Sequence, residues 1–244
     1  MSSTPLPAAL GDLLRHPAHN LLAIAVAAAA PGGEVEGESL ALMRRQVDAG
    51  LLDQLTPGAV WPIFVRGLMA AAPSGMLQVL RACGALQVLL PELEALFGMP
   101  QSADDPPTVD LGENVLRSVD AAARQQAPLS VRFAALVFNV GKSDSPPEHL
   151  PFHYRHMERG LPRIQVIAAR FGVPPDGVDL AVLALHEVER IHRAAPSRAG
   201  SIAAMLERLD AFARRDRFDG LLAVCSADYR AYPGRATRSY PKAA

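Results

Sequence analysis

Residues 40–100 read LALMRRQVDAGLLDQLTPGAVWPIFVRGLMAAAPSGMLQVLRACGALQVLLPELEALFGMP, and this stretch decides the fold class. Thr56-Pro57 is typical of a helix start, because proline suits the first helical position. Pro73-Ser74 opens another helix, and Glu38-Ser39 precedes an amphipathic helix that ends at Gly50. The inward-facing apolar residues of these three predicted helices are Leu40, Leu42, Met43, Val47, Trp61, Phe64, Val65, Leu68, Leu77, Leu80 and Leu86. The stretch therefore predicts a compact helical array.

The rest of the chain also favours helix over sheet. Half of its 244 residues are apolar, only 5% are aromatic, and runs of β-branched residues are short. Helical patterns cover residues 112–126, 129–140, 156–171, 176–193, 197–213 and 217–229. We therefore expect an all-α protein.

One segment predicts a division of the chain. Residues 101–108 (QSADDPPT) are polar and contain adjacent prolines, which is typical of a linker. They separate a predicted helical domain over residues 1–100 from a second one over residues 101–244. The last residues, 231–244, are rich in proline, glycine, arginine and tyrosine, and we expect a loosely held tail there.

Charge and cysteine content exclude several function classes. The net charge is −1, so any contact with RNA must come from a local cationic patch and not from the charge of the whole chain. Cys83 and Cys225 lie far apart without a CxxC pair, and we expect two buried thiols rather than a redox or zinc site.

The apolar run over residues 21–30 has two interpretations. It precedes Pro-Gly-Gly and superficially resembles a signal peptide. Asp12 and Arg15 upstream give no clear positive bias, and the run is too short to span a bilayer. We favour a helix of small residues packed in the core, with no membrane partner and a location in the cytoplasm.

Two possible sites of chemistry are weak. Gly141-Lys142-Ser143 resembles the end of a phosphate-binding loop, but Leu136 stands where that motif requires glycine. His153, His156 and His186 could form a metal site on helical faces. Because no carboxylates follow at matching spacing, surface or capping roles for these histidines are favoured, and no cofactor is predicted.

The stretch over residues 40–100 closely resembles the neck of bacterial CCA-adding tRNA nucleotidyltransferases. Its most specific pieces are LTPGAVW, MLQVLRACGAL and LLPELEALFGMP. The similarity continues through VRFAALVFNVGK, HYRHMERG, FGVPPDGVDLAVLALHEVERIH and CSADYRA, to about Tyr232. It implies a helical neck followed by a helical bundle like an HD domain, the metal-dependent phosphohydrolase domain of such enzymes.

The resemblance also implies that the family's nucleotidyltransferase head is missing. Nothing before Leu40 supplies the D-x-D carboxylates that bind two metals in that head. Residues 19–29 correspond to the nucleotide-reading helix of the family, and leucine or alanine stands at each expected arginine. We therefore expect no addition of CTP or ATP to tRNA.

The metal ligands of the family's HD domain are mostly replaced. Position by position, the first histidine corresponds to Asn114 and the His-Asp pair to Asn139-Val140. A late His-Asp-x-x-His stretch becomes Val188 to His192, whereas His156 matches a family histidine. Asparagine is a poor substitute for imidazole or carboxylate on a transition metal, and valine offers no ligand. The resemblance thus predicts no metal and a pseudoenzyme, with Asn114, Asn139 and His156 as remnants of the site.

Three functions follow from this resemblance. The first is a non-catalytic module that binds tRNA or other RNA through Lys142, Arg155, Arg159 and Arg163, which follow the former metal motif. The second is a weak phosphohydrolase with a rearranged site at His153, His156 and His186. The third is a scaffold for a partner or a homo-oligomer, which would present an exposed apolar patch.

Overall fold

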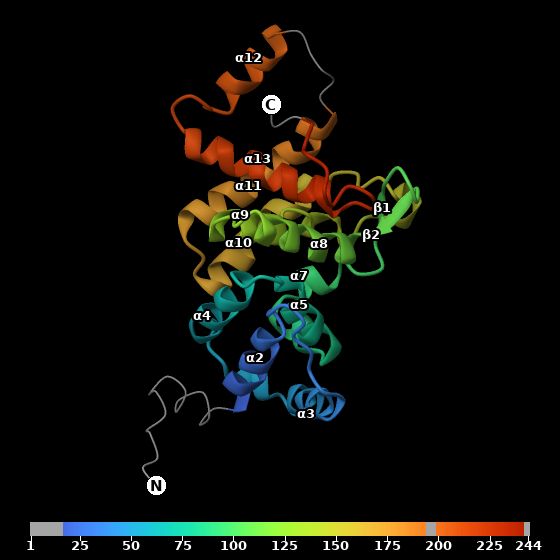
Figure 1. Ribbon diagram of the computed structural model, residues 1–244, viewed down its shortest axis with the longest axis vertical. Coiled ribbons are helices and arrows are strands. Elements are labelled where there is room, and N and C mark those ends of the chain that lie inside the picture. Colours follow the sequence, from blue (N-terminus) through green and yellow to red (C-terminus); the bar gives the residue numbers. More distant parts are fainter. Residues whose placement is uncertain (1–16, 194–198, 242–244) are drawn as a thin grey trace.

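The computed structural model describes residues 17–193 and 199–241, and its regular elements are helices apart from one short two-stranded hairpin (Figure 1). The all-α prediction is confirmed. The α-helices are α2 (Pro17–Ala27), α3 (Gly37–Asp48), α4 (Pro57–Leu68), α5 (Pro73–Ala82), α6 (Ala85–Leu89), α7 (Pro91–Glu94), α8 (Leu111–Arg124), α9 (Leu129–Val137), α10 (His156–Phe171), α11 (Pro175–Arg193), α12 (Ala199–Arg208) and α13 (Arg215–Ala231). The 3₁₀ helices are η1 (Leu51–Gln54), η2 (Val140–Lys142) and η3 (Pro147–His149).

The apolar run near the start forms part of α2, which packs against α4 and α5. Its residues Leu21, Leu22 and Ala25 are buried, as expected for a core helix. A Cβ on Gly75 would lie 2.1 Å from the carbonyl oxygen of Ala28, so the small residue lets the start of α5 approach the segment that follows α2. Within the described ranges, no helix is long and apolar enough to cross a membrane.

Residues 101–108 belong to a short antiparallel hairpin and not to an extended linker. Strands β1 (Pro100–Ser102) and β2 (Thr108–Asp110) pair with Gln101 opposite Val109. The carboxylate of Asp110 accepts hydrogen bonds from the backbone N–H of Glu113, at 2.9 Å, and of Gly98, at 2.5 Å. Asp110 therefore caps α8 and fixes the hairpin to the end of the preceding helices.

The hydrophobic core continues across this hairpin. Trp61 and Phe64 of α4 stack on Phe171 of α10, with ring centroids 5.9 and 6.2 Å apart. The buried guanidinium of Arg132 in α9 donates to the carbonyl oxygens of Leu68 and Ala70, at 3.0 and 2.8 Å. One buried cluster thus joins the helices before and after the hairpin.

The helices after the hairpin form a bundle in which α8 and α9 pack against α13 and α11 (Figure 1). The 3₁₀ turn η2 lies against α10, and Gly141 makes this approach possible. A Cβ at Gly141 would lie 2.0 Å from the carbonyl oxygen of His156 and 2.6 Å from the amide nitrogen of Gly160. In the segment expected to be loosely held, the side chain of Tyr240 is buried and its hydroxyl lies 3.0 Å from His192 Nδ1.

The approach of η2 to α10 predicts a large cost for a single methyl group. Gly141→Ala should lower the free energy of unfolding by about 3 kcal/mol, because backbone atoms of α10 must move. Gly58→Ala is the matched control, since no atom lies within 4 Å of a Cβ at this exposed position of α4. Urea denaturation of both variants measures the difference, and equal stabilities would contradict the packing described here.

Candidate functional site

A cavity of about 1000 Å³ lies between the loop before α10, the last turns of α11, the end of α13 and strand β1. The residues that line it are Gln101, Ser102, Phe138, Asn139, Lys142, Glu148, His149, Leu150, Pro151, Phe152, His153, Tyr154, His156, Met157, Val188, Glu189, His192, Arg193, Asp228 and Tyr232. Asn139, His156, Val188 and His192 are among the positions that the resemblance predicts to match HD metal ligands, so the cavity is the candidate site.

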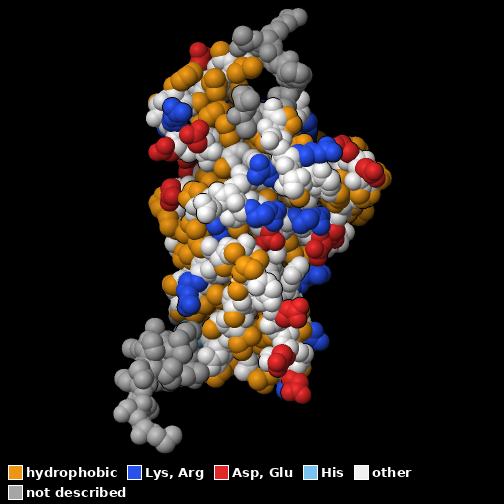
Figure 2. All heavy atoms as spheres, in the orientation of Figure 1, with side chains coloured by type: hydrophobic (Ala, Val, Ile, Leu, Met, Phe, Trp, Pro, Cys, Tyr) orange, Lys and Arg blue, Asp and Glu red, His pale blue; other side chains and the backbone are white. Residues whose placement is uncertain are grey.

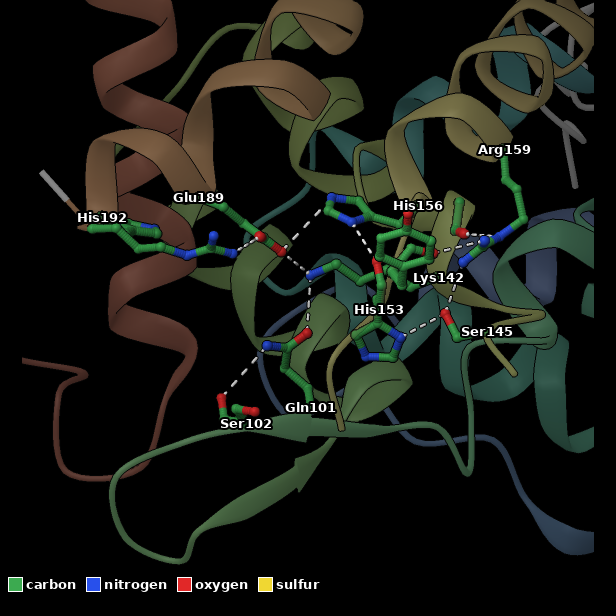
Figure 3. Close-up of polar contacts among 12 residues, drawn as sticks. Gln101, Ser102, Lys142, Ser145, His153, His156, Arg159, Glu189 and His192 are labelled. Carbon is green, nitrogen blue, oxygen red and sulfur yellow. Dashed lines mark hydrogen bonds and ion pairs between the residues drawn. The ribbon is translucent and has the colours of Figure 1, made fainter. Parts of the chain in front are cut away.

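A buried ion pair crosses the cavity wall (Figure 3). The Lys142 ammonium lies 2.8 Å from Glu189 Oε1 and 2.9 Å from the side-chain oxygen of Gln101. Only 4% of the Lys142 side chain is exposed, whereas Glu189 is 29% exposed and also pairs with Arg193. Because an unpaired buried charge is strongly unfavourable, η2, α11 and β1 are held together by this contact.

The ion pair keeps the carboxyl group of Glu189 ionised. Burial alone would raise the pKa of its carboxyl group, but the Lys142 ammonium outweighs that effect and lowers the pKa to about 2. Glu189 is therefore ionised throughout the physiological range.

His153 is fixed in the wall by both of its ring nitrogens. Its Nε2 lies 3.1 Å from the carbonyl oxygen of Pro100, which can only accept, so Nε2 carries the proton. Its Nδ1 lies 2.8 Å from Ser145 Oγ and accepts from that hydroxyl. Burial and the nearby Lys142 charge lower the pKa of His153 to about 4, so the ring is neutral at pH 7.

His156 is also buried and neutral. Its Nδ1 lies 2.8 Å from the carbonyl oxygen of His153 and donates to it, while its Nε2 lies 3.7 Å from Glu189 Oε1. Burial, followed by the charge of Lys142, lowers the pKa of His156. His186 lies one turn before Arg190 and lines a neighbouring cavity of about 400 Å³ with His156. Since His153 uses both nitrogens, these three histidines do not present three free ligands at one point.

Of the other positions that the resemblance predicts to match metal ligands, Asn114, Asn139 and Val188 are buried and His192 is half-buried. Asn114 and Asn139 are 1% and 3% exposed, and the Oδ1 atom of each has no hydrogen-bond partner among the described residues. Val188 is buried, and His192 bonds to Asp228 Oδ2 at 3.0 Å. Within residues 17–193 and 199–241, no group of three or more His, Cys, Asp or Glu side chains could hold a metal ion.

The four cations predicted to bind RNA do not form one open strip. Lys142 points into the cavity wall, whereas Arg159 and Arg163 converge on the carboxylate of Asp144 at 3.0 and 2.8 Å. Hydrogen bonds from Arg163 are the main reason why the pKa of Asp144 is lowered. Arg155 pairs with Glu158 on the exposed side of α10. Their role in RNA binding stays a prediction, but every one of them already has a carboxylate partner.

Sequence reasoning missed several residues of this site. Glu189 and Gln101 complete the contacts of Lys142, yet one lies on α11 and the other in a segment expected to be a linker. Phe152 and Tyr154 line the cavity with large exposed rings. The alternation of aromatic and basic residues in PFHYRH was the available signal for those two rings. Both predicted cysteine assignments are correct, since Cys83 and Cys225 are buried and free.

Comparison with known proteins gives the family relationship. No protein-family model matches the chain. It is 46% identical over 208 residues to a multifunctional CCA protein of Ralstonia nicotianae, a match that covers 85% of this chain and 48% of the relative. The corresponding protein of Cupriavidus necator is 44% identical over 210 residues, covering 86% of this chain and 51% of the relative.

The chain is therefore a tRNA nucleotidyltransferase-related, all-helical protein. It is a relative of the multifunctional CCA proteins over the part that it shares with them. A third match, to a protein of this name from Burkholderia vietnamiensis, is 44% identical over 209 residues. The chain spans about half the length of the curated relatives it matches.

The buried histidines predict how stability depends on pH. The free energy of unfolding should fall as the pH drops from 6.5 to about 4, because His153 binds a proton in the unfolded chain before it does so in the folded one. Below 4.5, protonation of Glu189 in the unfolded chain should extend the loss toward pH 2. Urea denaturation from pH 8 to pH 4 measures the first limb.

Two matched variants test whether His153 is the source of this pH dependence. His153→Gln should flatten the limb between pH 6.5 and pH 4 by about 3 kcal/mol, because its pKa falls from 6.5 to about 4 and each pKa unit corresponds to about 1.4 kcal/mol. His149→Gln, which changes an exposed histidine of the same cavity, should leave the limb in place. An unchanged limb in His153→Gln would show that this histidine titrates alike in both states.

Proposed function

We propose that this part of the chain is a non-catalytic module that binds tRNA or other RNA. The cavity supports the non-catalytic half of the proposal, because its cation is the Lys142 ammonium, 2.8 Å from Glu189. An ammonium has no vacant coordination position and cannot lower the pKa of a bound water as a catalytic metal does. The resemblance to CCA-adding enzymes makes tRNA the first RNA to test.

The proposal that the module binds RNA is supported by a group of arginines on α8 and at the end of α13. Arg117 and Arg124 lie seven residues apart on α8 and so point to the same side of that helix. Arg230 lies in the last turn of α13, and Arg238 follows in the segment that packs back on it. Figure 2 shows Lys and Arg side chains gathered across the middle of one face, over the region of α8 and α13.

These four arginines differ from the α10 cations in their partners. Arg117 Nε donates to the carbonyl oxygen of Ala231 at 2.8 Å, and Arg230 Nε donates to that of Arg238 at 3.1 Å. Both contacts leave the two terminal guanidinium nitrogens of each arginine for a phosphate. Among the described residues, no carboxylate oxygen lies within 4.0 Å of Arg117, Arg124, Arg230 or Arg238. A phosphate can therefore bind there without displacing an internal ion pair, as it would have to at Asp144.

The experiment is a titration of the protein with a tRNA at several salt concentrations. Binding through phosphates releases counterions, so the double variant Arg117→Ala/Arg124→Ala should weaken binding and reduce the salt slope by about two. Arg215→Ala is the matched control, because this arginine is 85% exposed but faces Asp219 at 3.7 Å. It should leave the slope nearly unchanged.

Two results would contradict the proposal. Absence of binding at low salt would exclude the RNA module. The salt slope of binding could also stay unchanged in Arg117→Ala/Arg124→Ala and fall in Arg155→Ala/Arg159→Ala. That result would place the RNA contact at the start of α10, where the sequence predicted it. Fluorescence anisotropy of labelled tRNA measures all four proteins under the same conditions.

A further inference from the structure

Two large aromatic rings stand exposed at the rim of the cavity. Phe152 is 74% exposed and Tyr154 is 65% exposed, and both line the cavity. Met157, at the start of α10, is 37% exposed beside them. Exposed apolar groups that gather at a cavity mark a binding surface more often than scattered ones do.

The loop presents these rings in a fixed geometry. His153 lies between them in sequence and is anchored in the wall through Ser145 and Pro100. The backbone N–H of Phe152 donates to the carbonyl oxygen of His149 at 2.7 Å, and the carbonyl oxygen of Tyr154 accepts from the Arg159 guanidinium at 2.8 Å. The backbone on both sides of an inward-facing residue is thereby held in place, so the loop loses little freedom when a ligand binds.

The charges of the cavity select against a phosphate and in favour of a neutral ring. Lys142 is neutralised by Glu189, and Arg193 also pairs with Glu189. Glu148 and Asp228 add two further carboxylates to the lining. With no surplus of positive charge, attraction must come from the apolar faces of the rings, which suit a flat heteroaromatic group.

We propose that the rim formed by Phe152 and Tyr154 stacks an unpaired base of a single-stranded RNA segment. This inference rests on the proposed function and names the part of the RNA that reaches the cavity. Stacking on aromatic rings holds single-stranded bases with little dependence on their sequence. The helix α13 borders both surfaces, since Asp228 and Tyr232 line the cavity while Arg230 belongs to the arginine group. An RNA whose phosphates lie along the arginines therefore has a route for its unpaired end into the cavity.

The test uses an RNA hairpin with a short single-stranded 3′ extension and the same hairpin with a blunt end. Phe152→Ala and Tyr154→Ala should each weaken binding of the extended hairpin by about tenfold, the effect of one lost stacking contact. Binding of the blunt hairpin should not change. The salt slope should stay as in the unmodified protein, because no phosphate contact is removed.

Two further variants serve as controls. Phe212→Ala removes an 80% exposed ring that does not line the cavity, and it should bind both hairpins normally. Tyr154→Phe keeps the ring and loses only the hydroxyl, so it should retain the affinity for the extended hairpin. Loss of affinity in Tyr154→Phe equal to that in Tyr154→Ala would overturn stacking.

The outcomes separate this inference from the proposed function. If neither hairpin binds the unmodified protein, the RNA module itself fails. If both hairpins bind and Phe152→Ala and Tyr154→Ala retain full affinity for the extended one, only the stacking rim is wrong. An equal loss in Phe212→Ala, or an equal loss for the blunt hairpin, would likewise overturn a specific site for an unpaired base.

Discussion

The ion pair between Lys142 and Glu189 is the interaction on which the candidate site depends. A buried ammonium is tolerated only because a carboxylate lies 2.8 Å away and Gln101 supplies a further acceptor. The same positive charge helps to keep His153 and His156 neutral. Because Lys142, Glu189 and Gln101 come from η2, α11 and β1, their contacts also fix the walls of the cavity relative to one another (Figure 3).

This arrangement gives the cavity a defined shape around an internal cation. Where the related enzymes are expected to use histidines and a carboxylate around a metal, this chain has Asn139 and Val188 in the wall and an internal cation beside them. The cavity persists because Gly141 still allows η2 to meet α10 and because His153 still ties the loop to β1. The groups of the cavity that face solvent are at its rim, where the side chains of Phe152 and Tyr154 are exposed.

Local patterns predicted the helices well, since helix starts such as Thr56-Pro57 and the apolar spacing of α4 and α5 depend only on neighbouring residues. The resemblance to CCA-adding enzymes located the cavity through positions such as His156. What could not be predicted were contacts between distant segments: the hydrogen bond from Lys142 to Gln101, the pairing of Arg159 with Asp144, and the burial of Tyr240. Their partners lie up to tens of residues away, and charge alone does not reveal which cations are already neutralised.

The most direct test of this account is a titration with Mn²⁺ followed through the histidine ring signals by NMR. A paramagnetic ion such as Mn²⁺, bound at the cavity, would broaden the signals of His153 and His156 at stoichiometric concentrations. With the Lys142 ammonium as the cation of the site, we expect these signals to stay sharp and calorimetry to detect no bound Mn²⁺. Stoichiometric binding that broadens both histidines would contradict the account and restore a metal to the site.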